Sequence, residues 1–87
     1  MIKVGDIVNI GDAVKERIID LCKEHDISIN KLSTISGVNQ STLNNIVSGR
    51  NKSTTISTIK KICDGLDITI QDFFNSDIFT ELEQEIK

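Results

Sequence analysis

The sequence predicts one all-helical domain of five short helices, followed by a sixth helix at the C-terminus. Three observations support this fold class. Apolar residues recur at spacings of three and four along most of the chain, which is the helical period. A residue suited to capping a helix precedes each periodic stretch. The length of 87 residues, of which 38 % are apolar, allows one modest core and no second domain.

Residues 1–11 are rich in β-branched side chains and contain two glycines, so we expect an extended N-terminal arm there, with a short strand or a frayed end as the alternatives. Asp12 is the predicted N-cap of a helix that runs to about His25. The apolar stripe of this helix consists of Val14, Ile18, Leu21 and Cys22. We place the main domain at residues 12–76, with this helix as its first element.

Two helices joined by a tight turn are predicted next, over residues 29–36 and 40–48, with Ser28 and Asn39 as their N-caps. Gly37 lies between them, where a chain reversal needs a positive φ that glycine adopts most easily. The first helix has an apolar stripe of Leu32 and Ile35, and the second has one of Leu43, Ile46 and Val47. These stripes predict that the two helices pack against a common core.

The helix over 40–48 has a polar face without a single charge. That face consists of Gln40, Ser41, Asn44 and Asn45. Exposed helix faces usually carry Lys and Glu, whereas Asn and Gln can form bidentate hydrogen bonds to adenine in the major groove. These four side chains therefore suit a face that reads DNA bases. An ordinary surface helix that happens to be rich in amides explains them equally well, and the helix alone does not decide between the two.

Two further helices follow a polar loop. Thr55 is the predicted cap of the first, and its apolar positions are Ile56, Ile59, Ile62, Cys63 and Leu66. Thr69 and Asp72 resemble a capping box at the start of the second, whose apolar residues would close the core. The remaining segment, 77–87, has apolar residues at helical spacing and acidic residues between them, so we expect an amphipathic tail helix that docks on its own domain or on a second copy.

The charges are distributed unevenly. The chain as a whole has a net charge of −3, but residues 27–63 contain no acid. Their basic residues are Lys31, Arg50, Lys52, Lys60 and Lys61. A DNA backbone responds to local positive potential rather than to total charge. Chance clustering is the less favoured explanation, because the acid-free block coincides with the two-helix unit.

Other classes of function lack support in the sequence. No apolar run is long enough for a membrane span and no signal peptide is visible, so we expect a cytoplasmic protein without a membrane partner. His25 is the sole histidine, and Cys22 and Cys63 are expected to be buried thiols. No nucleophile–base pair, metal-ligand spacing or phosphate-cradling loop is present, so we predict no enzyme activity, no metal and no cofactor.

Residues 28–75 resemble the phage-repressor/Cro-type helix-turn-helix family, also called the xenobiotic-response-element family. The resemblance lies in L-S-T-I-S-G-V-N-Q-S-T-L-N-N-I-V-S-G-R and in T-I-S-T-I-K-K-I-C-D-G-L-D-I-T-I-Q-D-F-F. It implies a lambda-repressor-like fold in which the third helix enters the major groove. By position, Gln40, Ser41 and Asn45 would reach base edges with Asn44 close by. The phosphate contacts would be Ser28, Asn39, Arg50 and Lys52, to which we add Lys31 from the acid-free segment.

Two positions depart from the family pattern. Ile29 stands where many relatives have a phosphate-binding Gln, and Asp67 stands where relatives usually have Gly at the end of the fourth helix. Asp tolerates the left-handed conformation better than most residues, so we expect the turn at Asp67 to survive.

The resemblance implies a regulator of transcription that binds double-stranded DNA, most often as a repressor. Twofold symmetric operators suit dimers, so we expect a homodimer, or dimerisation on DNA. Residues 68–86 are the expected contact, and the N-terminal arm is the second choice. One alternative is an antitoxin-type regulator that binds operator DNA with its helix-turn-helix and a toxin protein with its tail, 77–87. Another is an adaptor that binds only protein.

Overall fold

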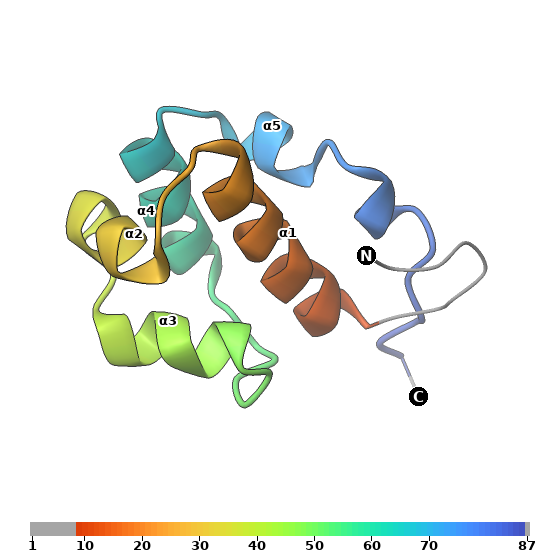
Figure 1. Cartoon of the computed structure of the whole chain (residues 1–87). Helices are drawn as coiled ribbons and strands as arrows, with labels where there is room; N and C mark the ends of the chain where they lie inside the picture. The colour runs from red at the N-terminus through yellow and green to blue at the C-terminus, as the bar shows by residue number, and fades with distance from the viewer. Residues whose placement is uncertain (1–8, 87) are drawn as a thin grey trace.

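The computed structural model describes residues 9–86, and these contain α-helices and one 3₁₀ helix but no regular strand (Figure 1). The elements are α1 (Ile10–Glu24), α2 (Ile29–Ser36), α3 (Gln40–Val47), α4 (Ile56–Leu66), α5 (Ile70–Phe74) and the 3₁₀ helix η1 (Asp77–Phe79). The predicted all-helical architecture is confirmed for the described residues. None of the described helices has the length and apolar character that crossing a membrane requires.

Helix α1 begins earlier than predicted. Asn9 is its N-cap, and the Asn9 Oδ1 accepts a hydrogen bond from the Asp12 N–H at 2.8 Å. The prediction of Asp12 as the cap was therefore wrong: this residue lies in the first turn, where its negative charge suits the helix dipole. The predicted arm over 1–11 thus loses residues 9–11, and residues 1–8 lie outside the described part of the chain.

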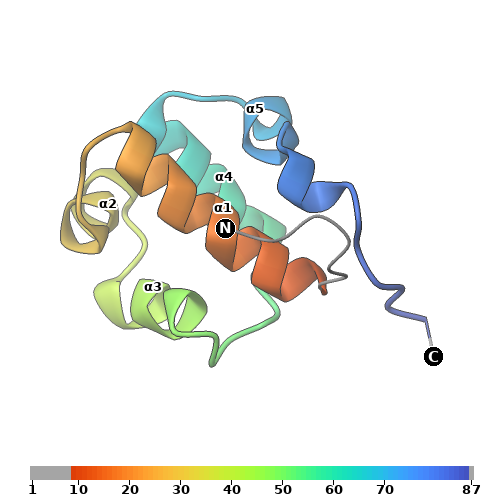
Figure 2. The ribbon, with the colours of Figure 1, turned by 45° about the vertical axis from the view of Figure 1, so that its right-hand side comes forward.

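The core lies where α1, α2, α3 and α4 meet, with α1 running through the middle of the molecule (Figure 2). The side chains that are 2 % exposed or less include Ile18, Leu21, Leu32, Leu43, Ile46, Ile62, Cys63 and Phe73. Helices α2 and α4 approach closely at Gly65, where an added Cβ would lie 2.9 Å from the Ile35 carbonyl oxygen. A side chain at position 65 would force these two helices apart.

The predicted caps of the next four helices are confirmed. The side-chain oxygens of Ser28, Asn39, Thr55 and Thr69 each accept a hydrogen bond from a backbone N–H in the first turn. Thr69 and Asp72 form the complete capping box. Gly37 ends α2 with a φ of 77°, in the left-handed region that its place in the sequence predicted.

The junctions α1–α2 and α4–α5 share a pattern that sequence reasoning overlooked. Residues 22–29 and 63–70 both read Cys-x-x-x-Asp-Ile-Ser/Thr-Ile. In each junction the aspartate has a positive φ, 54° at Asp26 and 58° at Asp67. The isoleucine that follows donates its N–H to the carbonyl of the cysteine, at 2.9 and 3.0 Å. The same short sequence thus ends one helix and caps the next at two places in the chain.

Helix α5 is attached to α1 by Arg17. The guanidinium Nε donates to the Phe73 carbonyl at 2.6 Å and Nη2 donates to the Asp72 carbonyl at 2.7 Å. A third contact, from Nη1 to a Glu24 carboxylate oxygen, measures 3.3 Å. The arginine satisfies carbonyls at the C-terminal end of a helix that is only five residues long.

The C-terminal tail differs from the prediction. Only Asp77–Phe79 are helical, as a 3₁₀ helix, and residues 80–86 form no helix, so the amphipathic helix expected over 77–87 is not present in the described residues. Phe79 packs against Phe74, with ring centroids 4.9 Å apart. Beyond this aromatic contact the segment packs little against the core, and Ile86 is 87 % exposed. A short helix without such packing is unstable in water, which explains why no helix forms here.

Candidate nucleic-acid interface

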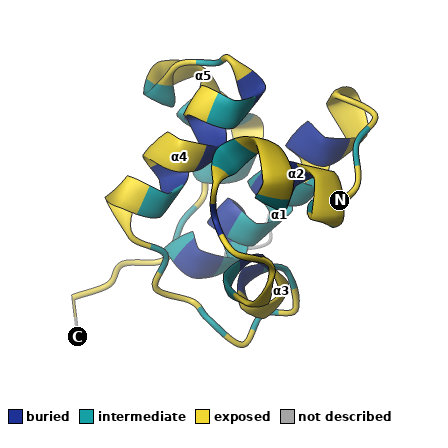
Figure 3. Ribbon diagram, turned by 90° about the vertical axis from the view of Figure 1, so that its left-hand side faces the viewer, coloured by how far each residue is buried: buried dark blue, intermediate teal, exposed yellow. Residues whose placement is uncertain are grey.

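The turn between α2 and α3 is held by serine side chains. The Ser33 Oγ donates to the Val38 carbonyl at 2.7 Å, and the Ser36 Oγ accepts from the Val38 N–H at 3.2 Å. Val38 itself is buried, so the turn is anchored by packing as well as by hydrogen bonds. These contacts set the angle at which α3 leaves α2 and lies along one edge of the molecule (Figure 3).

Helix α3 has two clearly different faces. Leu43 and Ile46 are 0 % and 1 % exposed, and they attach the helix to the core. All four residues predicted to contact bases, Gln40, Ser41, Asn44 and Asn45, are exposed. An uncharged polar surface is therefore presented outward on a helix whose other side is fixed.

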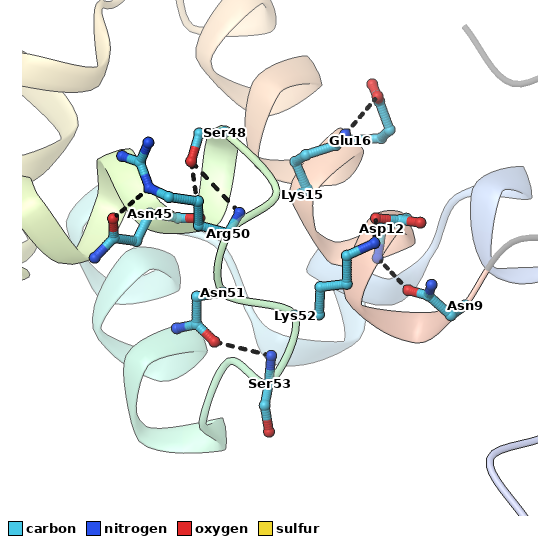
Figure 4. Close-up of polar contacts among 10 residues, drawn as sticks. All are labelled: Asn9, Asp12, Lys15, Glu16, Asn45, Ser48, Arg50, Asn51, Lys52 and Ser53. Atoms are coloured by element: carbon cyan, nitrogen blue, oxygen red, sulfur yellow. Dashed lines mark hydrogen bonds and ion pairs between the residues drawn. The ribbon is translucent and has the colours of Figure 1, made fainter.

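These four side chains differ in how far they are already engaged. The side-chain amides of Gln40 and Asn44 have no hydrogen-bond partner among residues 9–86, so they are free to bind a ligand. The Ser41 hydroxyl lies 3.1 Å from Asn39 Oδ1, the same oxygen that caps the helix. The Asn45 Oδ1 accepts a hydrogen bond from the Arg50 Nε at 3.1 Å (Figure 4).

The loop after α3 folds back on the end of the helix. Gly49 has a φ of 84°, which lets the chain reverse. The Asn45 carbonyl then accepts from the Asn51 N–H at 2.9 Å and from the Ser48 hydroxyl at 3.2 Å. Farther along, the Asn51 Oδ1 accepts from the Ser53 N–H at 2.9 Å, as Figure 4 also shows.

The same loop is fixed to the start of α1. A Cβ added to Gly11 would lie 2.8 Å from the Lys52 Cβ and 2.9 Å from its Cα, and closer still to its carbonyl oxygen. The Lys52 Nζ lies 3.4 Å from the Asp12 Oδ1. The loop is thus attached at both ends, to α3 through Asn45 and to α1 through Lys52.

The five residues predicted to contact phosphates, Ser28, Lys31, Asn39, Arg50 and Lys52, are all exposed. They are not equivalent electrostatically. Asp12, from outside the acid-free segment, offsets part of the charge of Lys52. The hydrogen-bond partner of Arg50 is a neutral amide, so its charge is not offset by that partner. The side-chain oxygens of Ser28 and Asn39 accept hydrogen bonds from the backbone N–H groups of Lys31 and Thr42, so these two donors are already used within the helix ends.

Sequence reasoning missed the contact between Asn45 and Arg50 and the one between Asp12 and Lys52. A separation of five residues falls outside the helical i,i+4 rule, and the second contact joins residues forty positions apart. The glycine at position 49 was a signal for the first contact, because it predicts a chain reversal directly after α3. No group of three metal-ligating side chains occurs among residues 9–86.

Comparisons with known proteins point in one direction. Residues 17–77 match the family described as the Cro/C1-type HTH DNA-binding domain. The crystal structure of the prophage Lp1 protein 11 is similar to this chain, with a TM-score of 0.72 and 38 % sequence identity. The match covers 80 % of this chain and 92 % of that one. No curated protein matches the sequence.

Proposed function

This chain belongs to the Cro/C1-type helix-turn-helix DNA-binding family, and on that basis we propose that it is a sequence-specific regulator of transcription, acting chiefly as a repressor. In this proposal α3 enters the major groove of double-stranded DNA. Gln40, Ser41, Asn44 and Asn45 contact base edges. Ser28, Lys31, Asn39, Arg50 and Lys52 contact phosphates. We propose no catalytic role and place the protein in the cytoplasm with its DNA.

One observation supports this function most strongly: α3 is buried on one side and presents an uncharged amide surface on the other. Leu43 and Ile46 are at most 1 % exposed, whereas Gln40 and Asn44 are exposed and their side-chain amides have no hydrogen-bond partner within residues 9–86. Unpaired amides at a fixed position can distinguish base pairs through their donors and acceptors. A surface with only a solubilising role would gain more from charged residues.

We further propose that the protein binds DNA as a homodimer. The twofold relation would place two α3 helices in half-sites about 34 Å apart. Residues 68–86 are the proposed contact, since this region carries apolar side chains that its own fold buries only in part, among them Phe74, Ile78, Phe79 and Leu82. A dimer bound over a promoter would exclude polymerase.

The antitoxin alternative loses the observation that favoured it. It relied on an amphipathic helix over 77–87, and residues 80–86 are not helical. We therefore propose the regulator alone.

Selection of bound sequences from random DNA duplexes tests the proposed function and the proposed dimer together. We expect a consensus with twofold symmetry whose binding weakens steeply as salt rises. Failure to enrich any sequence would contradict sequence-specific binding, and enrichment of a single unsymmetrical site would contradict the dimer.

Two substitutions then test the assigned roles. Gln40→Ala should lower discrimination at one base pair by about 1–3 kcal/mol. Lys31→Ala should weaken binding to all duplexes alike and reduce the dependence on salt. If the two variants behaved in the same way, the division between base and phosphate contacts would be wrong.

A further inference from the structure

The hydrogen bond between Asn45 and Arg50 joins a residue assigned to bases with a residue assigned to phosphates. Its direction follows from chemistry, because an arginine side chain has donors but no acceptor. The Arg50 Nε therefore faces the amide oxygen of Asn45, at 3.1 Å, and the amide nitrogen points elsewhere. This contact favours one orientation of an exposed asparagine side chain.

Hydrogen bonds to the Asn45 carbonyl support this arrangement independently of the Asn45–Arg50 side-chain contact. The Asn45 carbonyl accepts hydrogen bonds from the Asn51 N–H and from the Ser48 hydroxyl. Gly49 adopts the positive φ that brings the loop back along α3. Ser48 and Asn51, which flank Arg50 in the loop, therefore both bind the backbone of Asn45. Arg50 binds the side chain of the same residue.

We propose that Arg50 is a positioning residue for base recognition by Asn45, and that the two side chains act on DNA as one unit. This inference rests on the function proposed above. The Nε–H fixes the amide, while the terminal Nη groups stay available to a phosphate of the same half-site. Bases and backbone are then contacted by linked groups, and the removal of Arg50 changes sequence preference as well as affinity.

Lys31 provides a matched control. It is also an exposed cation in the acid-free segment, but it lies on α2, and no hydrogen bond or ion pair connects its side chain to the four α3 residues within the described structure. A cation that only contacts phosphate should affect all DNA sequences equally. Lys31→Ala shows that behaviour in our proposal, and Arg50→Ala does not.

The experiment measures affinities for the duplex selected from random sequences by the wild-type protein, and for duplexes that differ from it at single base pairs. The proteins are the wild type, Asn45→Ala, Arg50→Ala, the double variant and Lys31→Ala. Circular dichroism checks that each variant retains its helices, which we expect because all three positions are exposed.

We expect Asn45→Ala and Arg50→Ala to lower discrimination at the same base pair, by about five- to a hundredfold, the range that one good side-chain contact provides. The double variant should lose no more discrimination than Asn45→Ala alone, since the pair acts as a unit. Lys31→Ala should leave every ratio of affinities unchanged.

Two results would contradict the coupling: uniform weakening by Arg50→Ala, as for Lys31→Ala, or additive losses in the double variant. Either result would leave the proposed function intact, because the wild type would still discriminate among duplexes. Absence of discrimination by the wild type would instead contradict the proposed function itself.

Discussion

Helix α3 and the C-terminal tail are two short segments with a similar spacing of apolar residues and different structures. Both show apolar residues at helical spacing, and a polar residue with capping ability precedes each. Residues 40–47 form a regular helix, while residues 77–86 form only a three-residue 3₁₀ helix. The periodicity therefore did not decide the outcome.

Burial and capping differ between the two segments. Leu43 and Ile46 are almost fully buried, whereas Leu82 is half-buried and Ile86 is 87 % exposed. The Asn39 side chain accepts from the Thr42 N–H at 3.0 Å, which is a good N-cap hydrogen bond. Ser76 makes a weaker contact of 3.4 Å with the Ile78 N–H. In these two segments, an amphipathic sequence forms a regular helix only where its apolar side chains are buried in the core.

The largest expected contrast comes from truncating one leucine in each segment. Leu43→Ala removes a side chain that is 0 % exposed, and we expect a loss of about 2–5 kcal/mol in the free energy of unfolding. Leu82→Ala should cost less than about 1 kcal/mol, because the side chain is only half-buried. Urea denaturation followed by circular dichroism measures both. Equal losses would show that the tail contributes to the core as much as α3 does.

The second contrast concerns α5, the element from which the tail starts. Arg17→Ala removes two charge-assisted hydrogen bonds to the carbonyls of Asp72 and Phe73, and we expect a loss of about 1–3 kcal/mol. Lys15→Ala is the control, since its ion pair with Glu16, at 3.9 Å, lies near the surface and should contribute almost nothing. Matching effects of the two variants in the same denaturation assay would mean that α5 is held by packing alone.

A third contrast compares the two caps. Asn39→Ala removes the cap of α3 and should cost about 1 kcal/mol. Ser76→Ala should cost only a few tenths of a kcal/mol, because its hydrogen bond is long and the helix that follows has three residues. Thermal unfolding resolves a difference of this size. A larger effect at Ser76 would indicate that the tail depends on its cap after all.

The smallest expected effect is a pH dependence of the free energy of unfolding. It should come from two thiols in the core and not from the tail. Burial raises the pKa of the Cys22 and Cys63 thiols above the ordinary value of 9.0. The folded protein therefore holds these protons more tightly than the unfolded chain, and its stability is full below pH 9.0 and falls as pH rises above it. We therefore expect a small loss of stability as pH rises above 9.0, with a contribution from each thiol.

Denaturation midpoints between pH 7 and pH 10 measure this fall. A shortened chain that ends at Thr80 should show the same alkaline loss, because the thiols belong to α1 and α4 and not to the tail. If the shortened chain did not lose stability at alkaline pH, the tail would have to contribute to the burial of the thiols.

Much of the fold could be predicted because its signals are local. The caps at Ser28, Asn39, Thr55 and Thr69 act within three residues, and glycine at position 37 is the residue that a left-handed turn favours. The start of α1 was misplaced because Asn9 and Asp12 are both good caps, and the choice between them depends on packing beyond the helix.

The exposed position of the four α3 residues could also be predicted, from the angle that separates them from Leu43 and Ile46. The connections among site residues could not. Arg50 reaches Asn45 only because a loop reverses at Gly49, and Arg17 contacts carbonyls more than fifty residues away. Contacts of this kind depend on the assembled fold and have no period in the sequence.

The lack of a side chain at Gly11 has a consequence for DNA binding that no polar contact would reveal. Any larger residue there would collide with the backbone of Lys52 and displace the loop that carries Arg50. We therefore expect Gly11→Ala to impair DNA binding, although it changes no charge, no hydrogen-bonding group and no apolar core residue. The position of the loop against α1 thus depends on the absence of a Cβ atom at residue 11.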